Sequence, residues 1–252
     1  MRAWPEARIL SGFLGRDGGV SRGAYATLNL GTQVGDEPGA VEENWRRVRT
    51  RFPAATIFAQ LTQVHGGDVR VVTRANAGER RAGDGMVTDT EGIALAVFTA
   101  DCVPILMIDE ARGVAGALHA GWRGILAGIV ASGLDAMARL GAPARNLRAA
   151  LGPSIGPCCF EVDYELAERF AREIPGADGH ARDGRPGKAY LNLRGIVRQQ
   201  LLGAGVNAPA ISEIGPCTRC AADRYFSRRA AGGRTTGLQM SLVGLAAERS
   251  SG

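Results

Sequence analysis

Three short apolar runs follow one another in the middle of the chain, at Ile93 to Thr99, Pro104 to Ile108 and Val114 to His119. Each run is bounded by residues that break regular structure, and each has the length of a strand. The stretch is interrupted by Asp101 and is too short to cross a bilayer. The runs therefore predict buried strands at the centre of a globular protein.

The rest of the pattern alternates strands with helices. We expect further strands around 9–14, 57–64, 69–73, 148–151, 211–214 and 238–245, and helices over 39–51, 123–140, 164–172 and 193–203. Strand runs without a helix between each pair indicate an α/β protein with mixed sheets flanked by helices. The segment 174–188 is rich in Gly and Pro and is expected to be a surface loop. Dividing the chain there would leave too short a C-terminal piece for its own core, so one domain over residues 1–252 is expected.

The composition limits the metal chemistry available to the chain. It has only three His and five Cys in 252 residues. Multicopper oxidases and proteins with several haems need many imidazole ligands, so this chain can build one small transition-metal site and little more. The first residues lack the basic and apolar segments of a secretory signal, and we expect a cytoplasmic protein. In that reducing compartment the cysteines are thiols or metal ligands rather than a disulfide framework.

The charge pattern argues against a nucleic-acid binder. The chain has 30 basic and 25 acidic residues, a net charge of +5, and Lys188 is its only lysine. Basic and acidic residues are interleaved, as over 42–51, whereas a nucleic-acid face would cluster the basic ones. We therefore expect small-molecule partners, with no nucleic acid and no membrane. Arginine suits such partners when they carry phosphate, because its planar guanidinium contacts two oxygens at once.

A metal-ligand residue stands at the end of each of three apolar segments. His65 lies 37 residues before Cys102, and His119 lies 17 residues after it. The spacing is too long for one finger loop, so the three side chains would have to converge from separate strands. Two imidazoles and one thiolate suit zinc and leave a fourth position open, as catalytic zinc sites require. A blue-copper centre is an alternative, and so are two structural histidines with a buried apolar thiol.

The sequence closely resembles a known family. The resemblance is carried by TQVHG, TADCVPILMID, HAGWRG and LGPSIGPCCFEV, by GGVSRGAYATLNLGTQVGD before them, by DGMVT, and by CTRC and YFS near the C-terminus. In this order the motifs are similar to those of the laccase-domain family of zinc-dependent purine nucleoside phosphorylases. That family was earlier labelled multicopper polyphenol oxidase and includes peptidoglycan editing factor.

The resemblance implies a fold, a cofactor and a reaction. The fold is a four-layer α/β/β/α sandwich with mixed sheets, similar to the catalytic domains of cytotoxic necrotizing factors. The family's zinc ligands fall on His65, Cys102 and His119. They imply one zinc ion per chain, for which copper could substitute. The reaction is phosphorolysis of adenosine, inosine and S-methyl-5'-thioadenosine to the base and ribose 1-phosphate or its methylthio analogue. Adenosine deamination is implied as a second activity.

This chemistry assigns roles to further residues. Phosphate requires a cationic clamp, and the purine and the ribose require a proton donor and a nearby negative charge. The candidates are Arg123, Arg22, Arg229 and Gln63 for substrate and phosphate, and Asp101, Asp84 and Cys102 for catalysis. Each has a structural alternative: a surface ion pair for an arginine, a turn or a ligand-supporting role for an aspartate, and a backbone contact for Gln63.

Four cysteines remain outside the proposed metal-binding trio of His65, Cys102 and His119, called the trio below. Cys158 and Cys159 are adjacent, and Cys217 and Cys220 form a CxxC pair. Such a set can form a structural zinc site or a redox pair. Adjacent cysteines seldom both bind one tetrahedral metal, so we expect separate, partly buried thiols.

The chain departs from the family pattern at Asn192, Arg228 and Leu238, where relatives commonly carry an aspartate, an aromatic residue and an arginine. These departures leave the trio intact and affect the details of substrate binding.

Other functions fit parts of the pattern. In a cysteine hydrolase, Cys102 would be the nucleophile and His119 the base, assisted by His65, with peptidoglycan precursors as one class of substrate. A non-catalytic nucleotide-binding module would explain the surplus of arginine. Polyphenol oxidation lacks the necessary ligands and would reflect copper in the zinc position. A monomer or a weak homodimer is expected.

Overall fold

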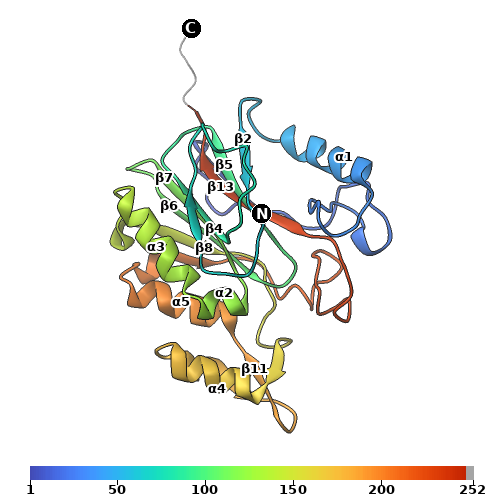
Figure 1. Cartoon of the computed structure of the whole chain (residues 1–252), viewed down its shortest axis with the longest axis vertical. Helices are drawn as coiled ribbons and strands as arrows, with labels where there is room; N and C mark the ends of the chain where they lie inside the picture. The colour runs from blue at the N-terminus through green and yellow to red at the C-terminus, as the bar shows by residue number, and fades with distance from the viewer. Residues whose placement is uncertain (248–252) are drawn as a thin grey trace.

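The computed structural model describes residues 1–247, and two β-sheets packed against each other form its centre (Figure 1). The first sheet has the order β1 (Ile9–Phe13), β13 (Gln239–Leu245), β5 (Ile93–Thr99), β2 (Ile57–Gln60). The second has the order β12 (Ile211–Glu213), β8 (Arg148–Leu151), β6 (Val103–Asp109), β7 (Val114–Ala120), β4 (Gly85–Thr88), β3 (Val69–Val71). Both sheets mix parallel and antiparallel pairs.

Helix α1 (Pro38–Arg49) covers the outer face of the four-stranded sheet. Helices α2 (Trp122–Leu126), α3 (Ile129–Arg139) and α5 (Leu193–Gly203) lie on the side of the six-stranded sheet, and α4 (Tyr164–Glu173) packs with a small third sheet. Short 3-10 turns span Gly23–Tyr25, Ala144–Asn146, Ala177–His180 and Ala208–Ala210. The third sheet has the order β10 (Ala181–Asp183), β11 (Lys188–Leu191), β9 (Glu161–Asp163). Figure 1 shows β11 and α4 together at the end of the molecule away from the C-terminus.

Alternating side chains build the layers. Successive residues of a strand point to opposite faces of its sheet. In β5, Leu95 packs between the two sheets while Phe98 packs outward against α1. In β6, Leu106 packs between the sheets while Met107 packs outward with α3 and α5. The result is a four-layer α/β/β/α arrangement with mixed sheets, as the family resemblance implies.

The apolar runs of the sequence are the central strands. Every residue of β5, β6 and β7 is buried, which confirms the prediction. Strands β6 and β7 form an antiparallel hairpin in which Val103 pairs with Ala120 and Pro104 with His119. This register brings the start of β6, next to Cys102, beside the end of β7. Because β4 pairs with β7 from the other side, Asp84 also reaches this edge of the sheet.

Two expected elements are wrong. The helix expected over 123–140 is divided into α2 and α3 because Gly128 has φ +81, a left-handed conformation that no α-helix continues through. The segment 174–188, expected to be a loop, contains β10, which pairs antiparallel with β11. Its Gly-rich part is the turn of this hairpin, with Gly187 at φ +75.

Candidate metal centre and its pocket

Three side chains from separate segments converge at the edge of the six-stranded sheet. His65 lies in the loop after β2, Cys102 directly precedes β6, and His119 belongs to β7. The candidate ligand atoms of the three residues all lie within 4.8 Å of one another, and the imidazole rings are 4.8 Å apart at their centroids. His119 is buried, Cys102 half-buried and His65 exposed. The structure thus brings together the three residues selected from the sequence, in a group that could hold a metal ion.

The carboxylate of Asp84 contacts both His119 and the loop that carries His65. It is fully buried and lies 2.8 Å from Nδ1 of His119, which leaves Nε2 of that ring for the site. It also accepts hydrogen bonds from the backbone N–H groups of Val64, His65 and Gly66, at 3.2, 2.9 and 2.7 Å. Such an outer carboxylate fixes the orientation of a metal-binding histidine. Asp84 therefore positions two of the three side chains, and its contacts favour this role over the proton transfer expected for it.

The electrostatics of the trio favour a thiolate. Burial opposes ionisation of Cys102, but the imidazoles of His119 and His65 outweigh it and lower the pKa of the thiol to about 6. Burial disfavours the charged form of His119 as well, yet the Cys102 sulfur and the Asp84 carboxylate raise its pKa to about 9. For Asp84, burial acts upward, but its hydrogen bonds to His119 and to the His65 loop lower its pKa. Both shifts favour a thiolate–imidazolium pair of Cys102 and His119 at neutral pH when no metal is bound.

The backbone around the trio adopts uncommon conformations. His65 has φ +61 and Asp101 has φ +101, which non-glycine residues rarely adopt and which concentrate at functional sites. Gly121 packs directly against the site, since a Cβ atom there would meet Sγ of Cys102 at 3.0 Å and Cδ2 of His65 at 3.1 Å. A residue with a side chain would therefore press on two of the three candidate ligands.

The carboxylate of Asp101 holds two loops together. Its Oδ1 accepts a 2.6 Å hydrogen bond from the hydroxyl of Thr218, and its Oδ2 accepts a 2.7 Å bond from the backbone N–H of Arg229. Its own carbonyl accepts from the N–H of Ile155 at 2.8 Å. These contacts favour a structural role for Asp101, next to Cys102, over the acid catalysis expected from the sequence.

A pocket of about 270 Å³ opens over the trio. This volume is near the lower end of the roughly 300–1,000 Å³ found for small-molecule sites. Its walls come from the loop 30–34, the end of β5 and the segments around 228 and 236–238. The apolar part of the lining is Leu30, Val34, Leu61, Phe98 and Leu238.

The arginines of the pocket are not those that the sequence indicated. Arg80 and Arg228 line it, whereas Arg22, Arg123 and Arg229 are absent from its lining. Arg80 donates to the hydroxyl of Thr32 and to the side-chain oxygen of Gln60. Within residues 1–247, no ion pair to a carboxylate is recorded for Arg80 or Arg228. Neither positive charge is therefore paired with a carboxylate, although the guanidinium of Arg80 already donates to two neutral oxygens of the pocket.

The expected arginines have other contacts. Arg123 is exposed and its guanidinium lies over the ring of Trp122, 4.3 Å from the centroid. Arg229 donates from Nη1 to the carbonyls of Cys159 and Glu161, at 3.0 and 2.9 Å. Arg22 is exposed and directly precedes the turn Gly23–Tyr25. The geometry gives none of the three a place against the trio.

Gln63 lines the pocket, but its amide is committed to the backbone. Its Nε2 donates to the carbonyl of Phe98 at 2.8 Å, and its Oε1 accepts from the N–H of Phe98 at 2.7 Å. The pair of bonds ties the loop that carries His65 to the end of β5. Gln63 thereby orients the site rather than offering free polar atoms to a ligand.

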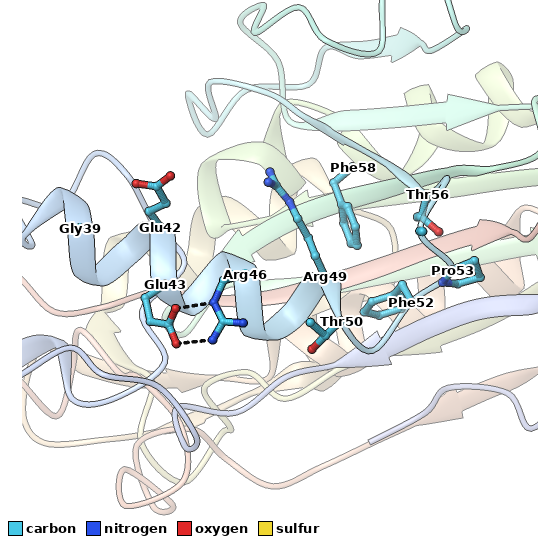
Figure 2. Close-up of a pocket in the computed structure, with 11 residues that line it drawn as sticks. Gly39, Glu42, Glu43, Arg46, Arg49, Thr50, Phe52, Pro53, Thr56 and Phe58 are labelled. Atoms are coloured by element: carbon cyan, nitrogen blue, oxygen red, sulfur yellow. Dashed lines mark hydrogen bonds and ion pairs between the residues drawn. The ribbon is translucent and has the colours of Figure 1, made fainter.

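A second, larger hollow of about 800 Å³ lies between α1 and the segment 52–58 (Figure 2). Figure 2 shows Glu43 joined to Arg46 by two hydrogen bonds, with Phe52 and Phe58 nearby. Its lining contains neither histidine nor cysteine. The smaller pocket is therefore the candidate for chemistry.

Comparison with known proteins places the chain in a family. It matches the family described as multi-copper polyphenol oxidoreductase laccase over residues 10–246. The chain belongs to this laccase family. A Streptomyces coelicolor relative named purine nucleoside phosphorylase is 42% identical over 231 residues, 90% of this chain and 91% of the relative. The Geobacillus stearothermophilus relative named purine nucleoside phosphorylase YlmD is 34% identical over 252 residues, 95% of this chain and 91% of the relative.

Solved structures of similar proteins share the laccase-family fold found here. The crystal structure of YlmD from Geobacillus stearothermophilus superposes with a TM-score of 0.89 at 34% identity, covering 96% of this chain and 93% of that chain. A Neisseria meningitidis protein superposes with a TM-score of 0.86 at 36% identity, covering 98% of both chains.

None of the helices within residues 1–247 combines the length and apolar character that crossing a bilayer requires.

Of the three positions at which the sequence was expected to depart from the family pattern, two lie in the pocket. Arg228 lines it with a cationic side chain and Leu238 with an apolar one. Asn192 instead caps α5, where its side-chain oxygen accepts from the N–H of Gly195 at 3.0 Å. An asparagine performs this capping role as well as an aspartate.

Proposed function

We propose that this chain is a zinc-dependent purine nucleoside phosphorylase. The substrates are inosine, adenosine and S-methyl-5'-thioadenosine with inorganic phosphate, and the products are the free base and ribose 1-phosphate or its methylthio analogue. The observation that carries the proposal is that the trio and the arginines Arg80 and Arg228 line one small pocket. The names of the relatives, both purine nucleoside phosphorylases, support the same reaction class.

The donor set fits zinc. Two imidazole nitrogens and one thiolate sulfur are common zinc ligands, and at zinc-bound distances of about 2.0–2.3 Å such atoms lie roughly 3–4 Å apart. The ligand atoms here lie within 4.8 Å of one another, and Asp84 supplies the outer carboxylate that zinc-binding histidines usually have. When bound by His65, Cys102 and His119, zinc supplies a Lewis acid with one position open to substrate.

The arginines would hold the phosphate. Phosphate oxygens bind guanidinium groups through paired, charge-assisted hydrogen bonds. Arg80 lies on the segment before β4 and Arg228 on the loop that precedes β13, so the two approach the pocket from different parts of the chain. Their N–H groups would orient a phosphate oxygen toward the anomeric carbon and lower the barrier by prepositioning it.

The apolar wall would hold the purine. Phe98, at the end of β5, and Leu238 belong to the lining and would give the base apolar contacts. In the reaction a phosphate oxygen bonds to C1' of the ribose while the bond from C1' to the purine nitrogen breaks. The electron pair of that bond leaves with the base, which takes up a proton. Trp122 in the motif HAGWRG and Phe160 in LGPSIGPCCFEV could also stack on a purine by residue type, but both are absent from the lining.

Adenosine deamination would be a second activity of the same pocket. Here a water oxygen bonds to C6 of the purine ring and ammonia leaves, so that the product is inosine. The reaction needs no phosphate, and it should therefore be independent of Arg80 and Arg228.

One observation favours a second candidate function. Asp84, His119 and Cys102 stand in the order of a carboxylate–imidazole–thiol triad, with 2.8 Å between the first two residues. Such an arrangement can activate a cysteine for hydrolysis without a metal. A cysteine hydrolase acting on peptidoglycan precursors is therefore the alternative.

Product analysis separates these candidates. The zinc-loaded protein is incubated with adenosine, with and without phosphate, and adenine is resolved from inosine by chromatography. Adenine that forms only with phosphate supports phosphorolysis, and inosine alone would make the protein a deaminase. If neither adenine nor inosine forms and the metal-free protein hydrolyses a peptidoglycan precursor, the protein is the hydrolase.

A further inference from the structure

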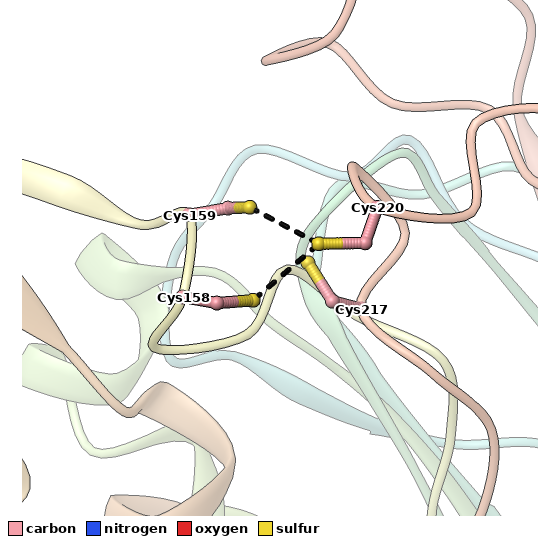
Figure 3. Close-up of side chains that lie close together, drawn as sticks. All are labelled: Cys158, Cys159, Cys217 and Cys220. Atoms are coloured by element: carbon pink, nitrogen blue, oxygen red, sulfur yellow. Dashed lines mark hydrogen bonds between the residues drawn. The ribbon is translucent and has the colours of Figure 1, made fainter.

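A second cluster of thiols lies apart from the trio. Cys158 and Cys159 stand in the turn before β9, and Cys217 and Cys220 stand in the turn after β12. The four sulfur atoms lie within 4.8 Å of one another, and Figure 3 shows that the side chains point toward a common centre. Sγ of Cys220 is 3.6 Å from Sγ of Cys158 and 3.4 Å from Sγ of Cys159. The separate thiols expected from the sequence are therefore a single cluster.

The spacing of the sulfur atoms matches a metal site better than a redox pair. A disulfide joins two sulfurs at about 2.05 Å and leaves the other two without a role. Around one zinc ion with Zn–S bonds of about 2.3 Å, four thiolates lie roughly 3.8 Å apart. The separations of 3.4 and 3.6 Å are close to that value, and they involve both adjacent cysteines. We propose that Cys158, Cys159, Cys217 and Cys220 bind a second, structural zinc ion.

Neighbouring groups stabilise negative charge on two of the four sulfurs. The backbone N–H of Gly156 donates to Sγ of Cys217 at 3.2 Å, and Nη1 of Arg219 donates to Sγ of Cys159 at 3.4 Å. Arg194, which donates to Ser154 and to the carbonyl of Gly215, adds a second cation near Cys217. A zinc ion with four thiolates carries two negative charges, which these two arginines would balance. Binding one zinc ion releases the four thiol protons to solvent.

The site clamps two loops that support the trio. The N–H of Thr218 donates to the carbonyl of Ser154 at 3.0 Å, so the segments are already paired beside the sulfurs. Thr218 lies between two of the ligands and donates to Asp101, the residue before Cys102. A zinc ion with four protein ligands has no open position, so its role is structural. It holds the Thr218–Asp101 contact in place and thereby steadies Cys102.

Metal stoichiometry tests the proposal without reference to activity. The chain is purified under reducing conditions, as wild type, as the trio variant Cys102→Ser/His119→Ala, and as the cluster variant Cys217→Ser/Cys220→Ser. We expect about two zinc ions per chain in the wild type and about one in each variant. Cobalt bound to the trio variant should show the strong thiolate-to-metal absorption of a tetrahedral site with four sulfurs.

Three results would overturn the proposal. The first is a folded trio variant that binds neither zinc nor cobalt. The second is zinc-saturated protein in which all four cluster thiols still react with a thiol reagent. The third is a protein mass lower by two hydrogens, which would reveal a disulfide in the cluster. Should the cluster variant not fold, the trio variant alone decides, because the cysteine cluster is the other group of candidate metal ligands found within residues 1–247. Loss of metal at the trio with retention at the cluster would affect the proposed phosphorylase and leave this site standing.

Discussion

The buried carboxylate of Asp84 lies 2.8 Å from Nδ1 of His119 and, through three backbone N–H groups, also fixes the loop that carries His65. One side chain thus positions two candidate ligands that are 54 residues apart in the sequence. The first prediction concerns this contact. Asp84→Asn should weaken zinc binding by about 10–100-fold, because an amide cannot accept all of these hydrogen bonds as the carboxylate does.

A competition titration with a zinc-binding dye measures the effect on affinity. Thermal unfolding of the metal-free protein provides the second readout, since a buried group that loses its partners costs roughly 1–3 kcal/mol. Unchanged affinity in a folded Asp84→Asn protein would show that the carboxylate does not support the metal centre.

The second prediction separates the arginines of the pocket from those outside it. Arg228→Ala or Arg80→Ala should raise the KM for phosphate by about 10–100-fold, since a hydrogen bond to a charged group contributes roughly 1.5–3 kcal/mol. Arg123→Ala is the matched control, because Arg123 is exposed on Trp122 and absent from the pocket lining. Steady-state kinetics at saturating inosine give the comparison. A larger rise in the KM for phosphate with Arg123→Ala than with Arg228→Ala would support Arg123 as the phosphate-binding residue, as expected from the sequence.

The third prediction uses the close approach of Gly121 to the trio. Gly121→Ala places a Cβ atom at 3.0 Å from the Cys102 sulfur and should lower zinc affinity by roughly tenfold or more. The backbone itself tolerates alanine, since φ at Gly121 is −76. Gly39→Ala is the control, because a Cβ there meets nothing within 4 Å. Equal zinc affinity in both variants would contradict the tight packing around Cys102.

The fourth prediction concerns the pH dependence of Cys102 in metal-free protein. The pKa of this thiol is lowered from 9.0 to about 6, so the reactive thiolate forms as pH rises through 6. Its alkylation by iodoacetamide, followed on the Cys102 peptide by mass spectrometry, should therefore rise between pH 5 and about 7 and then level off. The alkylation rate of an ordinary thiol, whose pKa is about 8.5–9, would keep rising to about pH 10.

The imidazolium of His119 is a main cause of this low pKa. His119→Ala should raise it and slow alkylation at pH 7 by roughly tenfold. A wild-type rate that still climbs above pH 8 would show that the thiolate–imidazolium pair does not form.

The strands could be predicted because their signals are local, and the trio because its members stand within motifs that resemble those of a known family. Apolar runs such as 93–99 mark buried strands, and His119 stands at the end of one. The break between α2 and α3 depends on the left-handed conformation of Gly128, and a glycine inside a helical pattern does not by itself reveal that conformation.

The phosphate-binding candidates could not be found in this way. Arg80 and Arg228 lie in loops and reach the pocket only through the packing of distant segments. Among so many arginines, the sequence motifs pointed to Arg123 and Arg229, whose side chains contact a ring and backbone carbonyls instead. The one sequence signal at either residue was the expected departure from the family pattern at Arg228.

The most direct test is the formation of ribose 1-phosphate from inosine and phosphate by zinc-loaded protein, measured beside chelated protein and the Cys102→Ser variant. We predict a phosphate-dependent product with the zinc-loaded wild type, its loss on chelation, recovery when zinc is returned, and no product with Cys102→Ser. Equal product from chelated and zinc-loaded protein, or none from either while a peptidoglycan precursor is hydrolysed, would contradict the assignment of this pocket to zinc-dependent phosphorolysis.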